Sequence, residues 1–125
     1  MKHLPKIEVE FINHSQQRYD TAGDYYKDGK KQILKISKMK NLDYEFSVMI
    51  HELIEWYLTE KRGIKEKDIM KFDLEHINSD DPGCILSAPY HKEHMFSMMI
   101  EKLLMKELDV DWDEYDKSFE DLKYE

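Results

Sequence analysis

The chain has 125 residues, of which 37% are charged and 41% apolar, and its formal net charge is -8 at pH 7. This composition is typical of a folded domain and excludes a disordered chain, and the absence of a basic stripe argues against a nucleic-acid partner. No run of about 18 apolar residues occurs, so we expect no membrane span. The lone Cys84 excludes a disulfide framework, and the N-terminus lacks the apolar segment of a signal peptide. We therefore predict a cytoplasmic protein with one domain over residues 1–125.

The N-terminal third predicts a small sheet. Residues 6–12 alternate apolar and charged side chains, which is typical of a strand with one buried face. Two further apolar runs, residues 25–26 and 33–36, flank Asp28-Gly29, a common turn of β-hairpins. We expect an antiparallel sheet within residues 7–38.

The rest of the chain predicts helices. A long helix, capped by Asn41 or Asp43, should run to about Arg62, where Gly63 ends it. Because this helix is apolar on most of its circumference, we expect it to be central. Further helices are expected over residues 65–77, 90–108 and 112–122. The predicted fold class is α+β, with the sheet packed on the central helix and two or three further helices around it.

The central helix carries the first candidate site, because His51 and Glu55 lie one turn apart on an otherwise apolar face. An ionised carboxylate on such a face costs several kcal/mol unless a proton, a cation or a metal pairs with it. A divalent metal held by both side chains meets this cost. Glu52, about a quarter turn away, is then placed to act as the general base on a bound water.

The helix predicted over residues 90–108 has the same peculiarity, because His94 and Glu101 share a face with methionines. We therefore predict that the two helices meet and that His51, Glu55 and His94 form a ligand set for zinc or another divalent metal, with the fourth position free for water. Several other side chains are candidates for the third ligand, for a hydrogen bond to a ligating imidazole or for oxyanion stabilisation: Glu101, His91, Asp73, His76 and Tyr90.

Several motifs resemble known proteins. Residues 51–55, His-Glu-Leu-Ile-Glu, look like the His-Glu-x-x-His helix of the zincins, a superfamily of metalloproteases. More closely, the order of the motifs resembles small uncharacterised phage and prophage proteins, in which a His-Glu-Leu-x-Glu helix precedes four further motifs. In this chain those motifs are Asp81-Pro82-Gly83, Pro89-Tyr90 with His94, Ile100-Glu101, and Asp111-Trp112 with Tyr115.

The zincin resemblance implies a minimal zincin-like domain in which His51 is a ligand and Glu52 is the general base. The chain departs from that pattern at Glu55, where a zincin has its second histidine. His94 would restore a set of two histidines and one glutamate in a different order. No activity is established for the phage and prophage proteins, so the resemblance to them implies none for this chain.

Two functions from different classes remain open at this point. The first is a zinc-dependent hydrolase, a minimal metallopeptidase acting on a peptide or protein substrate. The second is a non-enzymatic phage or prophage accessory protein that binds a partner, with a structural metal or a buried polar network between its helices. A carboxylate-bridged di-metal site in a helical bundle ranks below both, because the central helix lacks a Glu-x-x-His match.

Overall fold

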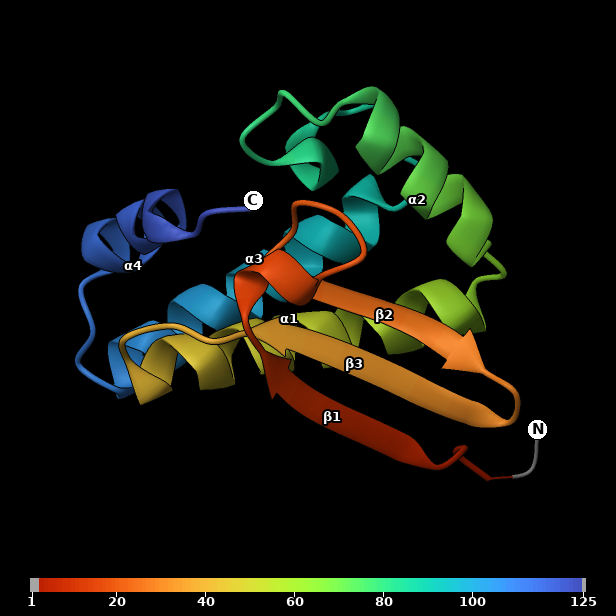
Figure 1. The fold of residues 1–125 in the computed structure, drawn as a ribbon, viewed down its shortest axis with the longest axis horizontal. Helices are drawn as coiled ribbons and strands as arrows, with labels where there is room; N and C mark the ends of the chain where they lie inside the picture. Colours follow the sequence, from red (N-terminus) through yellow and green to blue (C-terminus); the bar gives the residue numbers. More distant parts are fainter. Residues whose placement is uncertain (1–2, 125) are drawn as a thin grey trace.

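A three-stranded sheet is followed by four α-helices in the computed structural model, which describes residues 3–124 (Figure 1). The elements, with three short 3-10 helices (η), are in chain order β1 (Ile7–Ile12), η1 (His14–Gln16), β2 (Gly23–Asp28), β3 (Lys31–Ser37), α1 (Leu42–Lys61), α2 (Glu66–Glu75), η2 (Pro82–Cys84), α3 (His91–Glu107), α4 (Trp112–Ser118) and η3 (Phe119–Asp121). The predicted α+β class is confirmed. The predicted domain limits, residues 1 and 125, lie outside the described residues.

The predicted hairpin is formed by β2 and β3, which pair antiparallel with Asp28 opposite Lys31. The two-residue loop between them begins at Gly29, whose φ of 61° lies in the left-handed region. A glycine adopts this conformation without steric cost. The Asp-Gly signal in the sequence therefore marked the turn correctly.

The sheet is mixed, so the prediction of a purely antiparallel sheet was wrong. The strand order is β1-β3-β2, and β1 runs parallel to β3. After β1 the chain crosses the end of the sheet through residues 13–22 and starts β2 at the far edge, so that β3 returns between them. Two side chains of this crossing bind β3: Gln17 Nε2 donates to Lys35 O at 3.0 Å, and His14 Nδ1 lies 2.8 Å from Ser37 Oγ.

Helix α1 begins and ends where the sequence predicted. The side chain of Asn41 accepts a hydrogen bond from Asp43 N at 2.8 Å, which satisfies one free donor of the first turn. At the other end Gly63 has a φ of 70°, as is common just after a helix. One side of α1 covers the sheet, where Val48 packs in a cluster with Ile36.

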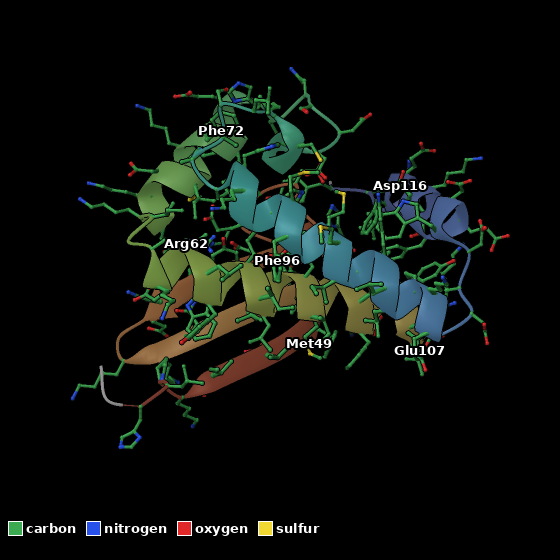
Figure 2. All side chains as sticks on the ribbon, turned by 180° about the vertical axis from the view of Figure 1, so that it is seen from behind. Met49, Arg62, Phe72, Phe96, Glu107 and Asp116 are labelled. Atoms are coloured by element: carbon green, nitrogen blue, oxygen red, sulfur yellow. The ribbon has the colours of Figure 1, made fainter. Side chains whose placement is uncertain are left out.

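Helix α3 runs antiparallel to α1 and packs along it (Figure 2). Just after the end of α1, Arg62 Nη1 donates to Glu93 of α3 at 2.6 Å, and halfway along α1 His51 contacts Glu101. The pairing brings the two His- and Glu-bearing faces together, as the sequence predicted. None of the helices in the described part of the chain combines the length and the apolar character needed to cross a membrane.

Candidate metal centre

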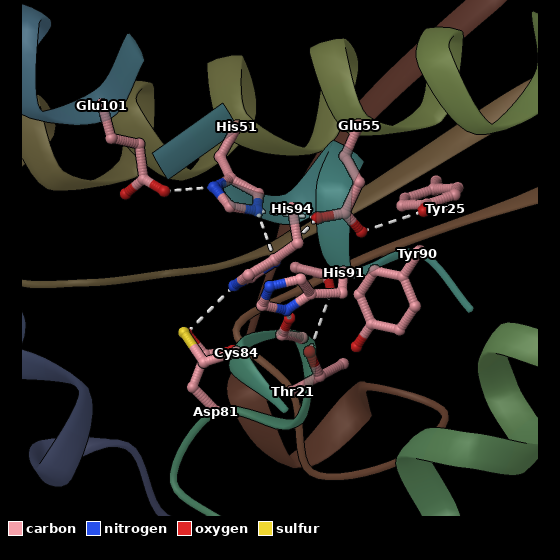
Figure 3. Close-up of polar contacts among 12 residues, drawn as sticks. Thr21, Tyr25, His51, Glu55, Asp81, Cys84, Tyr90, His91, His94 and Glu101 are labelled. Atoms are coloured by element: carbon pink, nitrogen blue, oxygen red, sulfur yellow. Dashed lines mark hydrogen bonds and ion pairs between the residues drawn. The ribbon is translucent and has the colours of Figure 1, made fainter. Parts of the chain in front are cut away.

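Two side chains of α1 form the base of the site. His51 and Glu55 are buried, with exposed fractions of 4% and 3%, and His51 Nε2 lies 2.8 Å from Glu55 Oε2. The four-residue spacing puts both on one face of the helix, as the sequence predicted. They point into the space between α1 and α3 (Figure 3).

Helix α3 adds the third side chain. His94 Nδ1 lies 2.9 Å from Glu55 Oε2 and 3.1 Å from His51 Nε2, so three atoms from two helices make a small triangle (Figure 3). This is the set named from the sequence, and its geometry could hold a metal ion. In a tetrahedral zinc site with bonds of about 2.0–2.1 Å the ligand atoms are about 3.3 Å apart, so the triangle is close to the required size.

Each imidazole has a carboxylate on its other ring nitrogen. His51 Nδ1 makes a short contact with Glu101 Oε1, and Tyr115 donates to the other oxygen of Glu101 at 2.6 Å. His94 Nε2 lies 3.0 Å from Asp81 Oδ2. Such carboxylates fix the tautomer and orientation of metal-binding histidines. Glu101, predicted as either a ligand or an orienting group, lies in the orienting position, whereas no role was predicted for Asp81.

These outer hydrogen bonds determine what the triangle can bind. If His51 Nδ1–H donates to Glu101 and His94 Nε2–H donates to Asp81, the inner nitrogens both present lone pairs. Together with Glu55 Oε2, three lone pairs then converge within 3.1 Å in a buried place. Lone pairs this close repel one another unless a cation or added protons lie between them. The arrangement therefore suits a metal cation.

Without a metal, protons can occupy the centre of the triangle, and the pKa values of His94 and Glu55 are shifted accordingly. Burial lowers the pKa of His94, but its hydrogen bonds to Asp81 and Glu55 outweigh burial and raise that pKa to about 10. Burial raises the pKa of Glu55, but hydrogen bonds from His51 and His94 outweigh it and lower that pKa to about 2. Burial lowers the pKa of His51 as well, but its hydrogen bonds to Glu101 and Glu55 outweigh burial and raise that pKa, so the metal-free centre favours protonated imidazoles. Metal binding must release these protons, because a ligating nitrogen is deprotonated.

Tyr25 of β2 completes the surroundings of Glu55. Its hydroxyl donates to Glu55 Oε1 at 2.9 Å, which leaves Oε2 as the oxygen of the triangle. Tyr25 was predicted to lie in a strand, and no pattern in the sequence indicated a part for it in the site. A hydrogen bond to one oxygen favours binding of a metal through the other oxygen alone.

Glu52 lies beside the triangle on the side of β2. It is half-buried and lines a partly open cavity of about 510 Å³, which also reaches His51, Glu55 and His94. Burial chiefly, and then the charge of Glu55, raise the pKa of Glu52 well above its ordinary value. Glu52 packs against Gly23, where a Cβ atom would lie 2.4 Å from Glu52 Cγ. The carboxylate is therefore next to the ligand triangle and outside it, as the prediction of a general base requires.

The remaining candidates take other positions. The hydroxyls of Tyr90 and Tyr19 both donate to Asp73 in the cavity wall, so Asp73 binds tyrosines and neither ligand histidine, and Tyr90 is engaged away from the triangle. His91 Nδ1 lies 2.9 Å from Gly83 O and holds the loop before α3. His76 stacks on Phe72, four residues earlier.

Asp81 offers a direct test of the orienting carboxylates. Replacing Asp81 with alanine removes the acceptor of His94 Nε2 and is expected to weaken zinc binding about 10–100-fold. The affinity can be measured by competition with a chromophoric chelator. The neighbouring Asp80→Ala is the matched control, because Asp80 is exposed and the carboxylate that pairs with His94 Nε2 is that of Asp81. Equal affinities in the two variants would contradict an orienting role for Asp81.

Comparison of the chain with models of protein families, with curated proteins and with solved structures finds no match. The resemblance to zincins and to phage and prophage proteins therefore stays a prediction.

Proposed function

We propose that this chain is a zinc-dependent hydrolase of the minimal metallopeptidase type, with His51, Glu55 and His94 as the metal ligands. The observation that carries the proposal is the convergence of three lone-pair atoms, from two helices, at the wall of a partly open cavity. Three protein ligands with free space beside them are typical of catalytic zinc sites, whereas structural sites are closed by four.

The chain's own residues supply the rest of the chemistry. Zinc bound at the triangle would polarise a substrate carbonyl and lower the pKa of a bound water towards about 7. Glu52, which lines the same cavity, would accept the proton of the attacking water and pass it to the leaving amine. Burial raises the pKa of Glu52 and so strengthens it as a base, because a carboxylate with a higher pKa accepts a proton from water more readily. With metal bound, Glu101 and Asp81 would hold the two imidazoles in the ligating tautomer.

An extended peptide could bind along β2, which is an edge strand next to the cavity. The backbone N–H of Lys27 donates to the Glu66 side chain at 3.0 Å, so it faces away from β3. Backbone direction alternates along an antiparallel strand, and the polar groups of Gly23 and Tyr25 therefore face the same way. Thr21 already donates to Gly23 O, which leaves Tyr25 as the main docking point beside Glu55.

The competing function is a non-enzymatic phage or prophage accessory protein in which the same residues form a structural metal site or a buried polar network. The non-enzymatic function uses the same ligand set as the hydrolase, but Glu52 has no role in a purely structural centre. A cytoplasmic location belongs to both proposals and agrees with the free thiol of Cys84.

Metal content tests the proposal first. Protein purified without chelator or nickel is expected to contain about one zinc per chain by elemental analysis, because one triangle of ligands binds one ion. His51→Ala and His94→Ala should each lose that zinc. The matched control is His76→Ala, which removes a histidine that stacks on Phe72 and lies outside the triangle. A parent protein that stays metal-free after zinc is supplied would refute the hydrolase proposal. Zinc retained in His94→Ala would show that His94 is not a ligand.

A further inference from the structure

Helices α1 and α3 share an apolar surface that faces away from the cavity, which we call the back face. Six large apolar side chains on it are at least 44% exposed: Leu42, Phe46 and Tyr57 of α1, and Phe96, Met99 and Leu103 of α3. At 100° per residue the three members on each helix fall within about 60° of one another. On α1 they lie roughly opposite His51 and Glu55. Figure 2 shows this side of the two helices, with Phe96 labelled over them.

The back face is unusual for a surface in contact with water. An amphipathic surface helix normally turns a charged face outward, whereas a helix that is apolar all round is normally buried on all sides. The sequence predicted that α1 is central. The described chain covers it with the sheet and with α3, and leaves the side that carries Leu42, Phe46 and Tyr57 exposed. The exposed fractions, from 44% to 82%, correspond to about 670 Å² of apolar surface at roughly 200 Å² for each full side chain.

That area matches what a second copy of the chain would cover. A standard stable interface buries about 800 Å² on each partner, which an apolar centre of about 670 Å² and a polar rim supply together. Two antiparallel helices facing an identical pair give a four-helix arrangement, one of the common ways in which helical faces are buried. In a two-fold symmetric dimer the same surface of each copy forms the interface, so the back face needs to be complementary only to itself.

The charges at the two ends of the back face fit one orientation of the copies. Lys61 and Lys92 are exposed at the end where α1 finishes and α3 begins, and Glu107 is exposed at the opposite end. A two-fold axis lying in the face and perpendicular to the helices brings the lysine end of one copy over the Glu107 end of its partner. The six side chains at the centre of the interface are uncharged, although each chain carries a net charge of -8.

We propose that the protein forms a two-fold symmetric homodimer in which the back faces of two copies pack together, α1 on α1 and α3 on α3. Because the back face and the cavity lie on opposite sides of the helix pair, both metal centres stay open in the dimer. The proposal does not depend on hydrolase activity, and a protein without metal would dimerise in the same way.

Sedimentation equilibrium over a range of protein concentrations tests the proposal. The parent chain is expected to have the mass of a dimer at high concentration, and Phe46→Glu and Leu103→Glu should each raise the dissociation constant of the dimer at least about tenfold, because each buries a carboxylate in the apolar centre. Both side chains are exposed in the single copy, so the variants should retain the parent's circular dichroism spectrum.

The matched control is Leu86→Glu, which makes the same change at a side chain that is 86% exposed in the loop before α3. This variant should dimerise as the parent does. A parent chain that is monomeric at every concentration would overturn the proposal and leave the back face to a different protein. A dimer that survives both Phe46→Glu and Leu103→Glu would overturn it as well, because its interface would then lie elsewhere.

Discussion

Replacing Glu52 with glutamine should leave zinc bound and reduce peptide hydrolysis by about 10²–10⁴-fold, the usual contribution of a general acid or base. Glutamine keeps the size of the side chain but cannot accept a proton from water. The three ligand atoms belong to other residues, so the metal content should not change. Zinc content and kcat/KM, measured on the same preparations with fluorogenic peptides, give both quantities.

A glutamate on the same helix provides the control for this change. Glu60 pairs with Lys27 at 2.8 Å on the outside of the molecule, so Glu60→Gln alters the same kind of group away from the cavity. Its turnover and zinc content should equal those of the parent. If Glu52→Gln hydrolyses peptides as fast as Glu60→Gln, Glu52 is not the base. Zinc in all three proteins with no hydrolysis by the parent would favour the structural centre instead.

Gly83→Ala should disrupt the metal centre from outside the ligand set. A Cβ atom at this buried position would lie 2.4 Å from His94 Cγ and 2.6 Å from Nδ1, closer than a carbon can approach. Asp81 holds the same ring from its other nitrogen, so the imidazole can yield only by leaving its place in the triangle. We expect zinc affinity to fall about 10–100-fold, as it does when the support of a ligand is lost. Competition with a chelator measures the change.

Gly23→Ala makes the same substitution on the other side of the cavity. Its Cβ atom would lie 2.4 Å from Glu52 Cγ and should displace the carboxylate while leaving the ligands in place. Gly23→Ala should therefore retain zinc and lose turnover, whereas Gly83→Ala should lose zinc. Equal zinc affinity in the two variants would show that the contact between Gly83 and His94 does not limit metal binding.

Local patterns in the sequence were sufficient for much of the fold. The cap at Asn41, the glycine at 63 and the turn at Gly29 each depend on a few neighbouring residues, and the structure has all three where they were expected. The direction of β1 was not predictable in this way. Alternation of apolar and charged residues says which face of a strand is buried, but the same alternation fits a parallel or an antiparallel neighbour.

For the candidate site, the sequence by itself determined that His51 and Glu55 share a face of one helix, because helical periodicity is a local property. It also put His94 on the comparable face of a second helix, and polar groups on two apolar faces are most stable where those faces meet. The tertiary structure alone decided that Tyr25 and Asp81 bind Glu55 and His94, and that Gly23 and Gly83 make room for Glu52 and His94. Such contacts join segments far apart in the chain, and no local pattern records which distant loop or strand will face a given side chain.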